Sequence, residues 1–482
     1  QLAGMPLVIK PANQGSSIGA GILPDDSAGA FMQMVNTAFF VKEIAPSNWK
    51  LLNRESKFQF LRELIDIRTG TGLPAVLYPM QSICHHPDEL FDLLEQYCQL
   101  PANTQTIRLE AFDKEHEVII EGFLQGKEFS CIVIKGENGE AIALPPTEIR
   151  KGKELFDYRS KYLAGLSSKV TPIHLPTVQI DAIRAECERL FWYFKFNTYA
   201  RIDGFITPHG HIFLNDPNTT SGMLPSSFFF HQAAEIGLNP SQFLTYIIRN
   251  SLQERAENGF YNPKTVELAQ HLDERLQHLK THTADKKVIG VILGGYSTER
   301  HISVESGRNI YEKLASSDKY LPIPIFLTGN NREYDLYEIP VNILLKDNAD
   351  DIAEKIKHFT THPVTEEVMH RAQAITQKYC FTANPEPRKL SFAELAARVD
   401  AVFIALHGRP GEDGNLQQHL EKYGIPYNGS GIATSKITID KYVTGQLLRQ
   451  HGFHVAQQLL IQKTDWKNNP HQLLGSIEHR FS

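Results

Sequence analysis

Short apolar runs bounded by glycine-rich turns predict strands near both ends of this chain. Residues 5–9 (MPLVI) form the first run, which is followed by Lys10 and the small-residue loop of residues 15–19 (GSSIG). Residues 287–293 (KVIGVIL) form a later run, which ends in a Gly-Gly turn before a helix that we expect from about Val304. Apolar runs of this length are typical of buried strands. The later run therefore predicts the start of a new α/β domain.

Between these two strands the pattern predicts mixed helices and strands. Apolar residues recur at helical spacing over residues 180–194. Two strands, residues 199–206 and 212–215, flank Pro208-His209-Gly210, which is a hairpin signal. Further helices are predicted over residues 28–41, 86–100, 228–236 and 240–252, and further strands over residues 117–135 (as strand, turn and strand) and 141–149.

The back half alternates strands with helices. A second buried strand, residues 399–406, precedes the glycine-rich turn of residues 407–414 (HGRPGEDG) and a helix over residues 416–423. Residues 437–451 predict one amphipathic helix, which Gly452 ends. Strands that alternate with helices indicate a parallel α/β sheet in this half.

Composition narrows the class of protein. With 482 residues, 41% of them hydrophobic and 22% charged, the chain has an ordinary globular composition and room for roughly two to four domains. The net charge of -6 gives no reason to expect nucleic acid or an anionic membrane as a partner. No apolar run approaches the roughly 18 residues of a spanning helix. Five scattered cysteines without a CxxC pair favour reduced thiols in a cytoplasmic protein.

The predicted hairpin gathers oxygen ligands at one end of a sheet. Asp203 starts one strand, and Asp216 and Asn218 end its antiparallel partner, so the three side chains are expected to lie close together. Such oxygens suit Mg²⁺, a hard cation that also bridges substrate phosphates. Arg201 lies two residues before Asp203 on the same strand face, where it could stabilise an anion beside the metal. A hairpin with solvated end charges is the alternative.

Two weaker signals precede this hairpin. The loop of residues 15–19, after Lys10, offers backbone N–H groups that can fold over a triphosphate. It lacks the P-loop order, and a plain turn is the alternative. Glu121 and Glu128 flank a turn between apolar strands, where Glu128 could accept hydrogen bonds from ribose hydroxyls. An ordinary hairpin is the simpler interpretation of that turn.

Three further signals lie in loops. Lys161 and Tyr162 belong to a polar loop that can act as a lid, although a solvated loop is commoner. Residues 294–299 (GGYSTE) form a strand-to-helix turn whose amides can bind an anion. His407 and Gly408 end a buried strand, where ligands of open α/β sheets usually bind. A lone histidine there is more often structural, so the order of all the motifs decides the interpretation.

In combination the motifs resemble the D-alanine–D-alanine ligase family. Those of the front half resemble, in order, its ATP-grasp half: Lys10 with the GSSIG loop, Glu121 and Glu128, Lys161-Tyr162, Arg201-x-Asp203 and Asp216-x-Asn218. Those of the back half resemble its N-terminal half: the turn at Glu299, His407-Gly408 with residues 411–414, and Asp440-Lys441. Residues 25–110 and 330–395 look like expansions of the family pattern.

The resemblance implies a fold, a reaction and partners. The fold is α/β and α+β, an ATP-grasp fold plus a Rossmann-like parallel-sheet domain. The reaction joins two D-alanines into D-alanyl-D-alanine through an acyl phosphate, for peptidoglycan precursor synthesis. ATP and two Mg²⁺ ions, or Mn²⁺ in their place, are the implied cofactors. Such ligases are commonly homodimers, so we expect one.

Carried over position by position, the resemblance implies a role for each matched residue. The residues implied to contact ATP are Lys10, Ser16, Ser17, Glu121, Leu124, Glu128, Lys161 and Lys441. Those implied to bind metal are Asp203, Asp216 and Asn218. Those implied in catalysis are Glu299, Ser16, Tyr162, Arg201 and the Gly222 amide. Those implied to hold substrate are Glu299 on the first ammonium, His407 near its carboxylate, and Ser227 on the second D-alanine's carboxylate.

Three departures leave the second substrate open, one of which is the absence of the family's usual Pro before Gly222. Asp216 stands where the family usually has Glu, and Phe228 stands where a smaller apolar residue usually lines the acceptor site. A ligase for another dipeptide is therefore one alternative. A catalytically degenerate module that binds nucleotide is another.

The order of the two halves is the reverse of the family's. We expect an ATP-grasp domain over residues 1–255 with an insertion at about 25–110, and a closing helix and linker over residues 256–285. We expect the N-terminal ligase domain over residues 286–435 with an insertion at about 330–395, and the start of a second ATP-grasp domain over residues 436–482. A piece of a tandem of two ligase modules is the favoured explanation, and a circularly permuted single ligase is the alternative.

Overall fold

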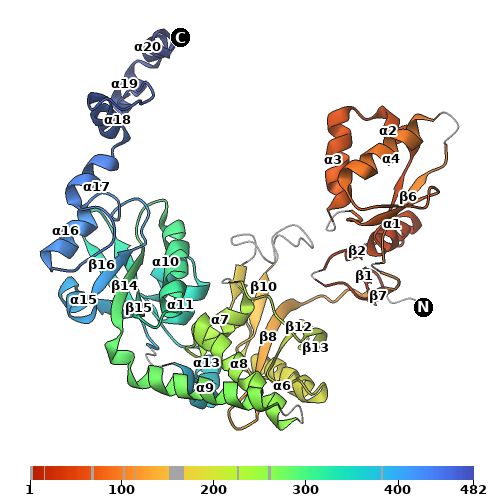
Figure 1. Ribbon diagram of the computed structural model, residues 1–482, viewed down its shortest axis with the longest axis horizontal. Coiled ribbons are helices and arrows are strands. Elements are labelled where there is room, and N and C mark those ends of the chain that lie inside the picture. Colours follow the sequence, from red (N-terminus) through yellow and green to blue (C-terminus); the bar gives the residue numbers. More distant parts are fainter. Residues whose placement is uncertain are drawn as a thin grey trace. The chain divides into compact units, whose positions relative to one another are not determined.

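The computed structural model describes residues 4–481 except for 16, 67–69, 101–103, 114, 151–167, 225–226, 259–261 and 381–383. This chain divides into two compact units, whose elements are labelled in Figure 1. The first unit holds residues 1–130, 148–170 and 203–216, and the second holds residues 131–147, 171–202 and 217–482.

A three-stranded antiparallel sheet opens the first unit. Its order is β2-β1-β7, with β1 (Leu7–Pro11), β2 (Gly21–Leu23) and β7 (Val118–Gly122). Helix α1 (Ala28–Ala38) begins after Ser27, whose side chain accepts a hydrogen bond from the Ala30 amide. Leu7, Ile9 and Leu23 pack against this helix and bury the inner face of the sheet.

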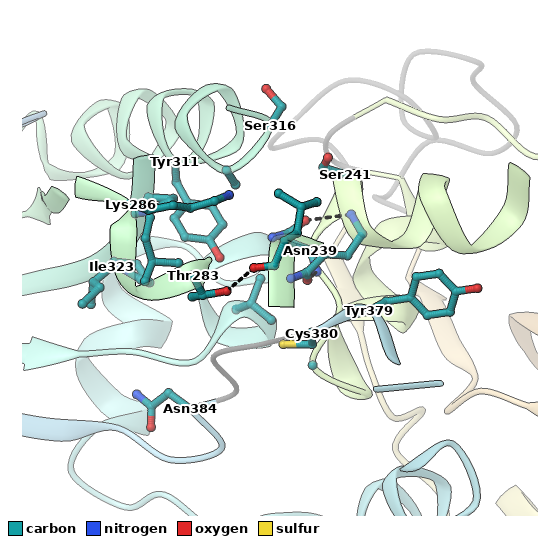
Figure 2. Close-up of a pocket in the computed structure, with 18 of the residues that line it drawn as sticks. Asn239, Ser241, Thr283, Lys286, Tyr311, Ser316, Ile323, Tyr379, Cys380 and Asn384 are labelled. Atoms are coloured by element: carbon teal, nitrogen blue, oxygen red, sulfur yellow. Dashed lines mark hydrogen bonds between the residues drawn. The ribbon is translucent and has the colours of Figure 1, made fainter. Parts of the chain in front are cut away.

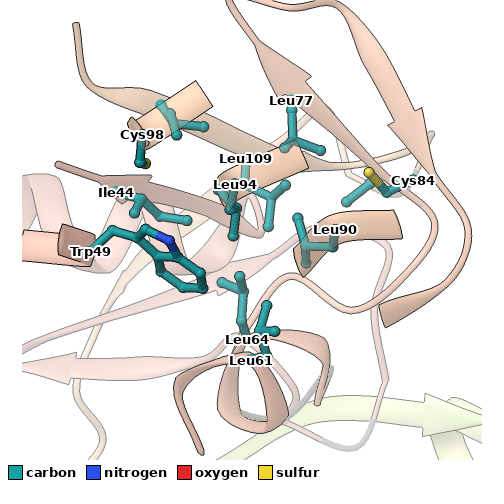
Figure 3. Close-up of a cluster of buried hydrophobic side chains, with 12 residues drawn as sticks. Ile44, Trp49, Leu61, Leu64, Leu77, Cys84, Leu90, Leu94, Cys98 and Leu109 are labelled. Carbon is teal, nitrogen blue, oxygen red and sulfur yellow. The ribbon is translucent and has the colours of Figure 1, made fainter. Parts of the chain in front are cut away.

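Residues 41–111 form a second sheet with a hydrophobic core of its own. Its strands are β3 (Val41–Ile44), β4 (Ala75–Tyr78), β5 (Ser82–Cys84) and β6 (Ile107–Ala111), in the order β3-β6-β4-β5, and its helices are α2 (Pro46–Leu51), α3 (Arg54–Ile65) and α4 (Pro87–Gln99). Figure 3 shows Trp49, Leu61 and Leu90 converging on this core. Because β3 and β6 are antiparallel neighbours, the segment begins and ends at one place. It falls within the stretch where we expect an insertion.

A six-stranded sheet carries the predicted hairpin. Its order is β11-β10-β8-β12-β13, with β9 paired to β8, and its strands are β8 (Lys127–Lys135), β9 (Ala141–Ala143), β10 (Thr147–Arg150), β11 (Ser168–Val170), β12 (Tyr199–Ile206) and β13 (Ile212–Asn218). The ordinary hairpin at Glu121 and Glu128 is wrong, because β7 pairs with β1 in another sheet. The single strand expected over residues 141–149 is two strands, since Pro145 and Pro146 lack the N–H that a ladder needs.

Four helices follow the strands of the front half. They are α6 (Thr177–Tyr193), α7 (Phe228–Glu235), α8 (Pro240–Glu257) and α9 (Pro263–Thr281), and a 3₁₀ turn (Thr283–Asp285) leads into the back half. Helix α8 begins with a capping box, in which Asn239 and Gln242 each accept the other's backbone amide. Helices α8 and α9 pack against each other.

The back half is a five-stranded sheet covered on both faces. Its order is β17-β16-β15-β14-β18, with β14 (Lys287–Gly294), β15 (Tyr320–Gly329), β16 (Tyr334–Glu338), β17 (Arg388–Leu390) and β18 (Ala401–Ile404). Strands β14, β15 and β18 are parallel, as expected, whereas β16 and β17 add to the sheet in antiparallel pairs. Both added strands come from the stretch where we expect an insertion.

The helices of this half are divided between the two faces. One face is covered by α10 (Arg300–Ala315), α11 (Val341–Lys346) and α12 (Ala349–Lys355), and the other by α15 (Phe392–Arg398) and α16 (Asn415–Lys422). Figure 1 shows α10 and α11 on one side of β14 and β15 and α15 and α16 on the other. Helices α13 (Pro363–Arg371) and α14 (Gln373–Tyr379) complete the segment between β16 and β17.

Two predictions about helices in this half are corrected. Helix α10 begins at Arg300 rather than at about Val304. Residues 437–451 are not one helix, because Asp440 caps a new one: its side chain accepts hydrogen bonds from the amides of Tyr442 and Val443. The helices at this end are α17 (Ile432–Thr438), α18 (Lys441–Gln450), α19 (Lys463–Asn468) and α20 (Pro470–Phe481). Among the described residues, no helix has the length and apolar character needed to cross a membrane.

Candidate functional site

The carboxyl-terminal edge of the back sheet brings the Glu299 turn and His407 together. The Ser297 hydroxyl donates to the His407 carbonyl at 3.0 Å and accepts from the Glu299 amide at 3.1 Å. A Cβ atom added at Gly408 would lie 2.7 Å from a carboxylate oxygen of Glu299. The Glu299 carboxylate is therefore packed against the backbone that follows His407, while Glu299 itself remains exposed to solvent.

Serines of α10 fix the position of His407. Ser303 Oγ accepts from the His407 amide at 2.9 Å and donates to the Glu299 carbonyl at 3.2 Å. Ser306 Oγ lies 2.9 Å from His407 Nε2. We missed both serines in the sequence, although Glu299, Ser303 and Ser306 follow the spacing of one helix face. That spacing is the signal by which they could have been found.

The glycine-rich turn after His407 lies beside Lys441. The Gly408 amide donates to Glu412 Oε2 at 2.9 Å. Glu412 and Lys441 both line a cavity of about 500 Å³, together with Ser430 and Ser435. Lys441 is the first residue of α18, directly after the Asp440 cap. The structure thus brings Lys441 next to the glycine-rich turn that follows His407.

On the front sheet, Lys10 pairs with Glu121. Their side chains form a salt bridge of 2.7 Å, since β1 and β7 are antiparallel with Val8 opposite Glu121. Glu128 lies on β8, in the adjoining sheet, and Leu124 lies in the connection between β7 and β8. The adenine and ribose residues expected there therefore lie where two sheets join. Ser17 has a positive φ of 58° in the small-residue loop, and Ser16 lies outside the described residues.

The metal ligands expected from the sequence lie on neighbouring strands. Asp203 is on β12, and Asp216 and Asn218 end β13, which is the next strand of the sheet. Burial alternates along β12, so that Arg201 and Asp203 share the face opposite the buried Ile202. Two carboxylates and an amide are hard oxygen donors, and such a set fits Mg²⁺.

The remaining predicted residues lie after β13 or outside the residues that the structure describes. Gly222 is exposed in the segment before α7. Ser227 is the residue before α7, and its hydroxyl is buried without a hydrogen-bond partner among the described residues. Phe228, the first residue of α7, is half-buried. Lys161 and Tyr162 lie outside the described residues.

A larger cavity lies elsewhere and contains none of the predicted residues. It has a volume of about 780 Å³ and is lined by α8, α9 and the starts of β14 and β15, at the edge of the sheet opposite Glu299. Figure 2 shows Tyr311, Lys286 and Asn239 around it. Burial lowers the pKa of the Lys286 amine, which donates to the Ser317 carbonyl at 3.2 Å. A large cavity is by itself no indication of chemistry, and this one is distinct from the Glu299 edge.

Comparison with known families divides the chain between its front half and its back half. Residues 98–249 match the family model described as D-ala D-ala ligase C-terminus. Residues 288–430 match the one described as D-ala D-ala ligase N-terminus. The two matches together cover more than half of the chain, in an order opposite to that of their names. The chain belongs to the D-alanine–D-alanine ligase family. Its ATP-grasp and parallel-sheet parts are accordingly those of such ligases, as the resemblance implied.

Individual ligases match only part of this chain. The D-alanine–D-alanine ligase of Chlorobium phaeovibrioides is 31% identical over 189 residues, which are 39% of this chain and 47% of that protein. Ligase B of Clostridium perfringens is 31% identical over 147 residues, or 30% and 47%. The crystal structure of the Bacillus anthracis ligase with ATP is 25% identical with a TM-score of 0.26, over 45% of this chain and 62% of that one. The chain spans about half the length of the curated ligases it matches.

Proposed function

We propose that this chain is an ATP-dependent ligase that joins two D-alanines into D-alanyl-D-alanine. The observation that carries the proposal is the packing of the Glu299 carboxylate against Gly408, beside His407, in a chain that holds both halves of the ligase family. A carboxylate next to a histidine at a sheet edge suits a zwitterion, because it offers one group for an ammonium and one for a carboxylate.

In the proposed reaction the first D-alanine's carboxylate attacks the γ-phosphorus of ATP and ADP leaves. The second D-alanine's amine then attacks the acyl carbon and phosphate leaves. Arg201 and the Gly222 amide would stabilise the oxyanion of the tetrahedral intermediate, which concentrates negative charge on one oxygen. Among the described residues the Ser227 hydroxyl is buried without a hydrogen-bond partner, and this supports a contact with the second carboxylate, because an unsatisfied buried hydroxyl costs free energy that a ligand's hydrogen bond would recover.

The nucleotide would lie against the front sheets. Lys10 and Lys441 would offer positive charge to the phosphates, Ser16 and Ser17 would cover them, and Glu121, Leu124 and Glu128 would hold the adenosine. Lys161 and Tyr162 keep the roles implied for the loop that covers the site. Two Mg²⁺ ions, held by Asp203, Asp216 and Asn218, would neutralise phosphate charge when bound. Cytoplasmic location and a homodimer belong to the same proposal.

A second candidate is a ligase with another acceptor. Phe228 at the start of α7 directly follows Ser227, so a bulky ring adjoins the residue proposed to hold the acceptor carboxylate. This ring restricts the acceptor side chain more than it affects the first substrate. A screen of D-amino and D-hydroxy acids as acceptors, at fixed D-alanine, separates the two candidates.

The test is ATP turnover by the purified chain with Mg²⁺, with and without D-alanine. We expect phosphate release that depends on D-alanine and falls by about 10²-fold or more in Arg201→Ala, because one oxyanion donor is typically worth that much. Arg189→Ala is the matched control, since Arg189 is an exposed arginine whose recorded ion pair is with Glu186 of the same helix. Binding of ATP without D-alanine-dependent turnover would instead favour a degenerate module.

A further inference from the structure

Two parts of the second unit pack against each other: the front lobe, residues 131–147, 171–202 and 217–257, and the back domain, residues 287–430. Helix α11 of the back domain packs on α7 of the front half, α13 packs on α6, and α14 packs on α8. The Thr376 hydroxyl donates to the Ile236 carbonyl at 2.8 Å, and the Tyr379 ring meets the Tyr246 ring edge to face at 5.6 Å. The back side of this contact, residues 341–379, comes from the stretch where we expect an insertion.

Charges are sorted across this contact. Three basic side chains of the back segment form salt bridges with acidic side chains of the front lobe. The pairs are Lys346 with Glu235, Arg371 with Glu188, and Lys378 with Glu137. One further pair, Arg184 with Glu367 at 2.6 Å, runs in the opposite sense. Complementary charges of this kind fix register and exclude wrong partners. The back segment is therefore matched in charge to this face of the lobe.

The Lys346–Glu235 pair is the most buried of these ion pairs. Both side chains are almost fully buried, with 8% and 2% exposed. Asn342 also donates to Glu235, at 3.3 Å. Burial alone would lower the pKa of the Lys346 amine, but the carboxylates of Glu235 and Asp347 raise it above its ordinary value. A buried charge without its partner is strongly unfavourable, so each half depends on the other here.

A chain of hydrogen bonds carries the contact into the lobe. Lys346 Nζ donates to the Thr171 carbonyl at 3.0 Å, and the Thr171 and Thr147 hydroxyls lie 2.7 Å apart. Gln232 of α7 donates to Thr147 at 3.0 Å and accepts from the Ile132 amide of β8 at 2.8 Å. Lys346 is thus linked through Thr171 and Thr147 to Gln232, in the middle of α7.

Two of the helices in this contact begin at residues of the proposed site. Helix α7 is docked near its end by Glu235 and begins directly after Ser227. Helix α10 is docked near its end, where Tyr311 bonds to Asn239, and begins directly after Glu299. Rigid helices of 8 and 16 residues, roughly 12 and 24 Å long, connect the contact to both residues.

We propose that the back domain of this chain completes the active site of the front lobe, so that both halves build one ligase site. In that site Glu299 and His407 act on the same substrate pair as Arg201 and Ser227, and residues 341–379 are the docking element that joins the halves. This inference rests on the proposed function. It favours the interpretation of the chain as a circularly permuted single ligase.

The docking element is tested by a double-mutant cycle on the full chain. Lys346→Met and Glu235→Leu each leave a buried charge alone, so we expect each to lower the unfolding midpoint and to raise deuterium uptake in residues 228–235 and 341–346. The double variant is expected to regain most of the loss, because apolar groups replace both charges. Lys378→Met is the control, since its pair with Glu137 is more exposed. Additive losses in the cycle would overturn the docking element.

The shared site is tested by D-alanine-dependent ATP turnover. Arg201→Ala and Glu299→Gln are each expected to abolish it, and a mixture of the two variants is expected to stay inactive. Recovery in the mixture, up to about a quarter of wild-type activity by random pairing, would assign the site to two copies and overturn the proposal. Full activity of Glu299→Gln would overturn it as well. If the double-mutant cycle supports the contact but wild-type ATP turnover does not depend on D-alanine, the proposed function is wrong and the contact between the halves is not.

Discussion

Gly408 has no room for a side chain. Its φ is +69°, in the left-handed region, and a Cβ atom would lie 2.7 Å from Glu299 Oε2 and 3.1 Å from Ser297 Oγ. Glycine is therefore required here for conformation and for close approach at once. The consequence is that the carboxylate proposed to hold the first ammonium is positioned by a backbone atom, with no flexible side chain in between.

Gly408→Ala is expected to impair substrate binding more than stability. The left-handed backbone costs about 1–2 kcal/mol with alanine, and the contact with Glu299 in addition displaces its carboxylate. We expect the KM for D-alanine to rise several-fold, measured by phosphate release over a D-alanine titration. Gly424→Ala is the control, because Gly424 has a φ of +66° with open space around it. Equal KM values in the two variants would contradict a role for Glu299 in binding.

Residue positions in the candidate site were predicted unevenly. Arg201 and Asp203 lie on the strand expected for them, because period-two alternation is a local signal. The strand expected over residues 399–406 is shorter, Ala401–Ile404, so that His407 lies three residues beyond its end. Ser303 and Ser306 were missed, since their role depends on a histidine about a hundred positions away. The salt bridge between Lys10 and Glu121 was missed for the same reason: it depends on the register of two distant strands.

At the scale of elements, residues 41–111 were the least predictable part. The charged, amphipathic pattern of residues 49–72 does not indicate that α3 packs on a sheet whose strands are up to seventy positions apart. In the back half, β16 and β17 were not foreseen, because these antiparallel strands of five and three residues are short and carry a weak pattern. The parallel strands β14, β15 and β18 are longer or more apolar on average, and two of them were predicted.

Trp49 anchors the core of residues 41–111. It is 1% exposed, its ring contacts Phe60 and Phe91, and its indole donates to Glu95 at 3.0 Å. Trp49→Ala is expected to destabilise this core by about 3–5 kcal/mol, through lost burial and the cavity left behind. Hydrogen–deuterium exchange should place the loss of protection within residues 41–111. Trp466→Ala, at an exposed tryptophan, is the control, and loss of protection throughout the chain would contradict a core of its own.

At the scale of the molecule, the two halves of the ligase family can build one site even though their order along the chain is reversed. Residues 341–379 form the part of the back domain that contacts the front lobe, and their basic side chains form salt bridges with acidic side chains of that lobe. Sequence motifs indicated both halves of the family and led us to favour a tandem piece over a permuted ligase. That choice depends on which surfaces meet, and surfaces are assembled from residues far apart in the chain.

Lys346 at this contact and the half-buried Lys286, which lines the larger cavity, give opposite pH dependences. The pKa of Lys346 is raised in the folded chain by Glu235 and Asp347 against the effect of burial, so its stabilisation is complete below the ordinary lysine pKa of about 10.4 and is lost as the pH rises through the folded value. The pKa of Lys286 is lowered by burial and by Arg275, against Asp318, so the cost of its charge is relieved as the pH rises toward 10.4.

The stability difference between wild type and each methionine variant isolates these effects. We compare the free energy of unfolding of wild type with that of each variant from pH 8 to about 11. The excess of wild type over Lys346→Met is expected to shrink, whereas the value of wild type relative to Lys286→Met is expected to rise. Urea unfolding at constant ionic strength measures both, and taking differences removes the titration of all other groups. Parallel curves for the two variants would mean that Lys346 has no ionic partner across the contact, and the docking of the two halves would then rest on apolar packing and the more exposed ion pairs of Arg371 and Lys378.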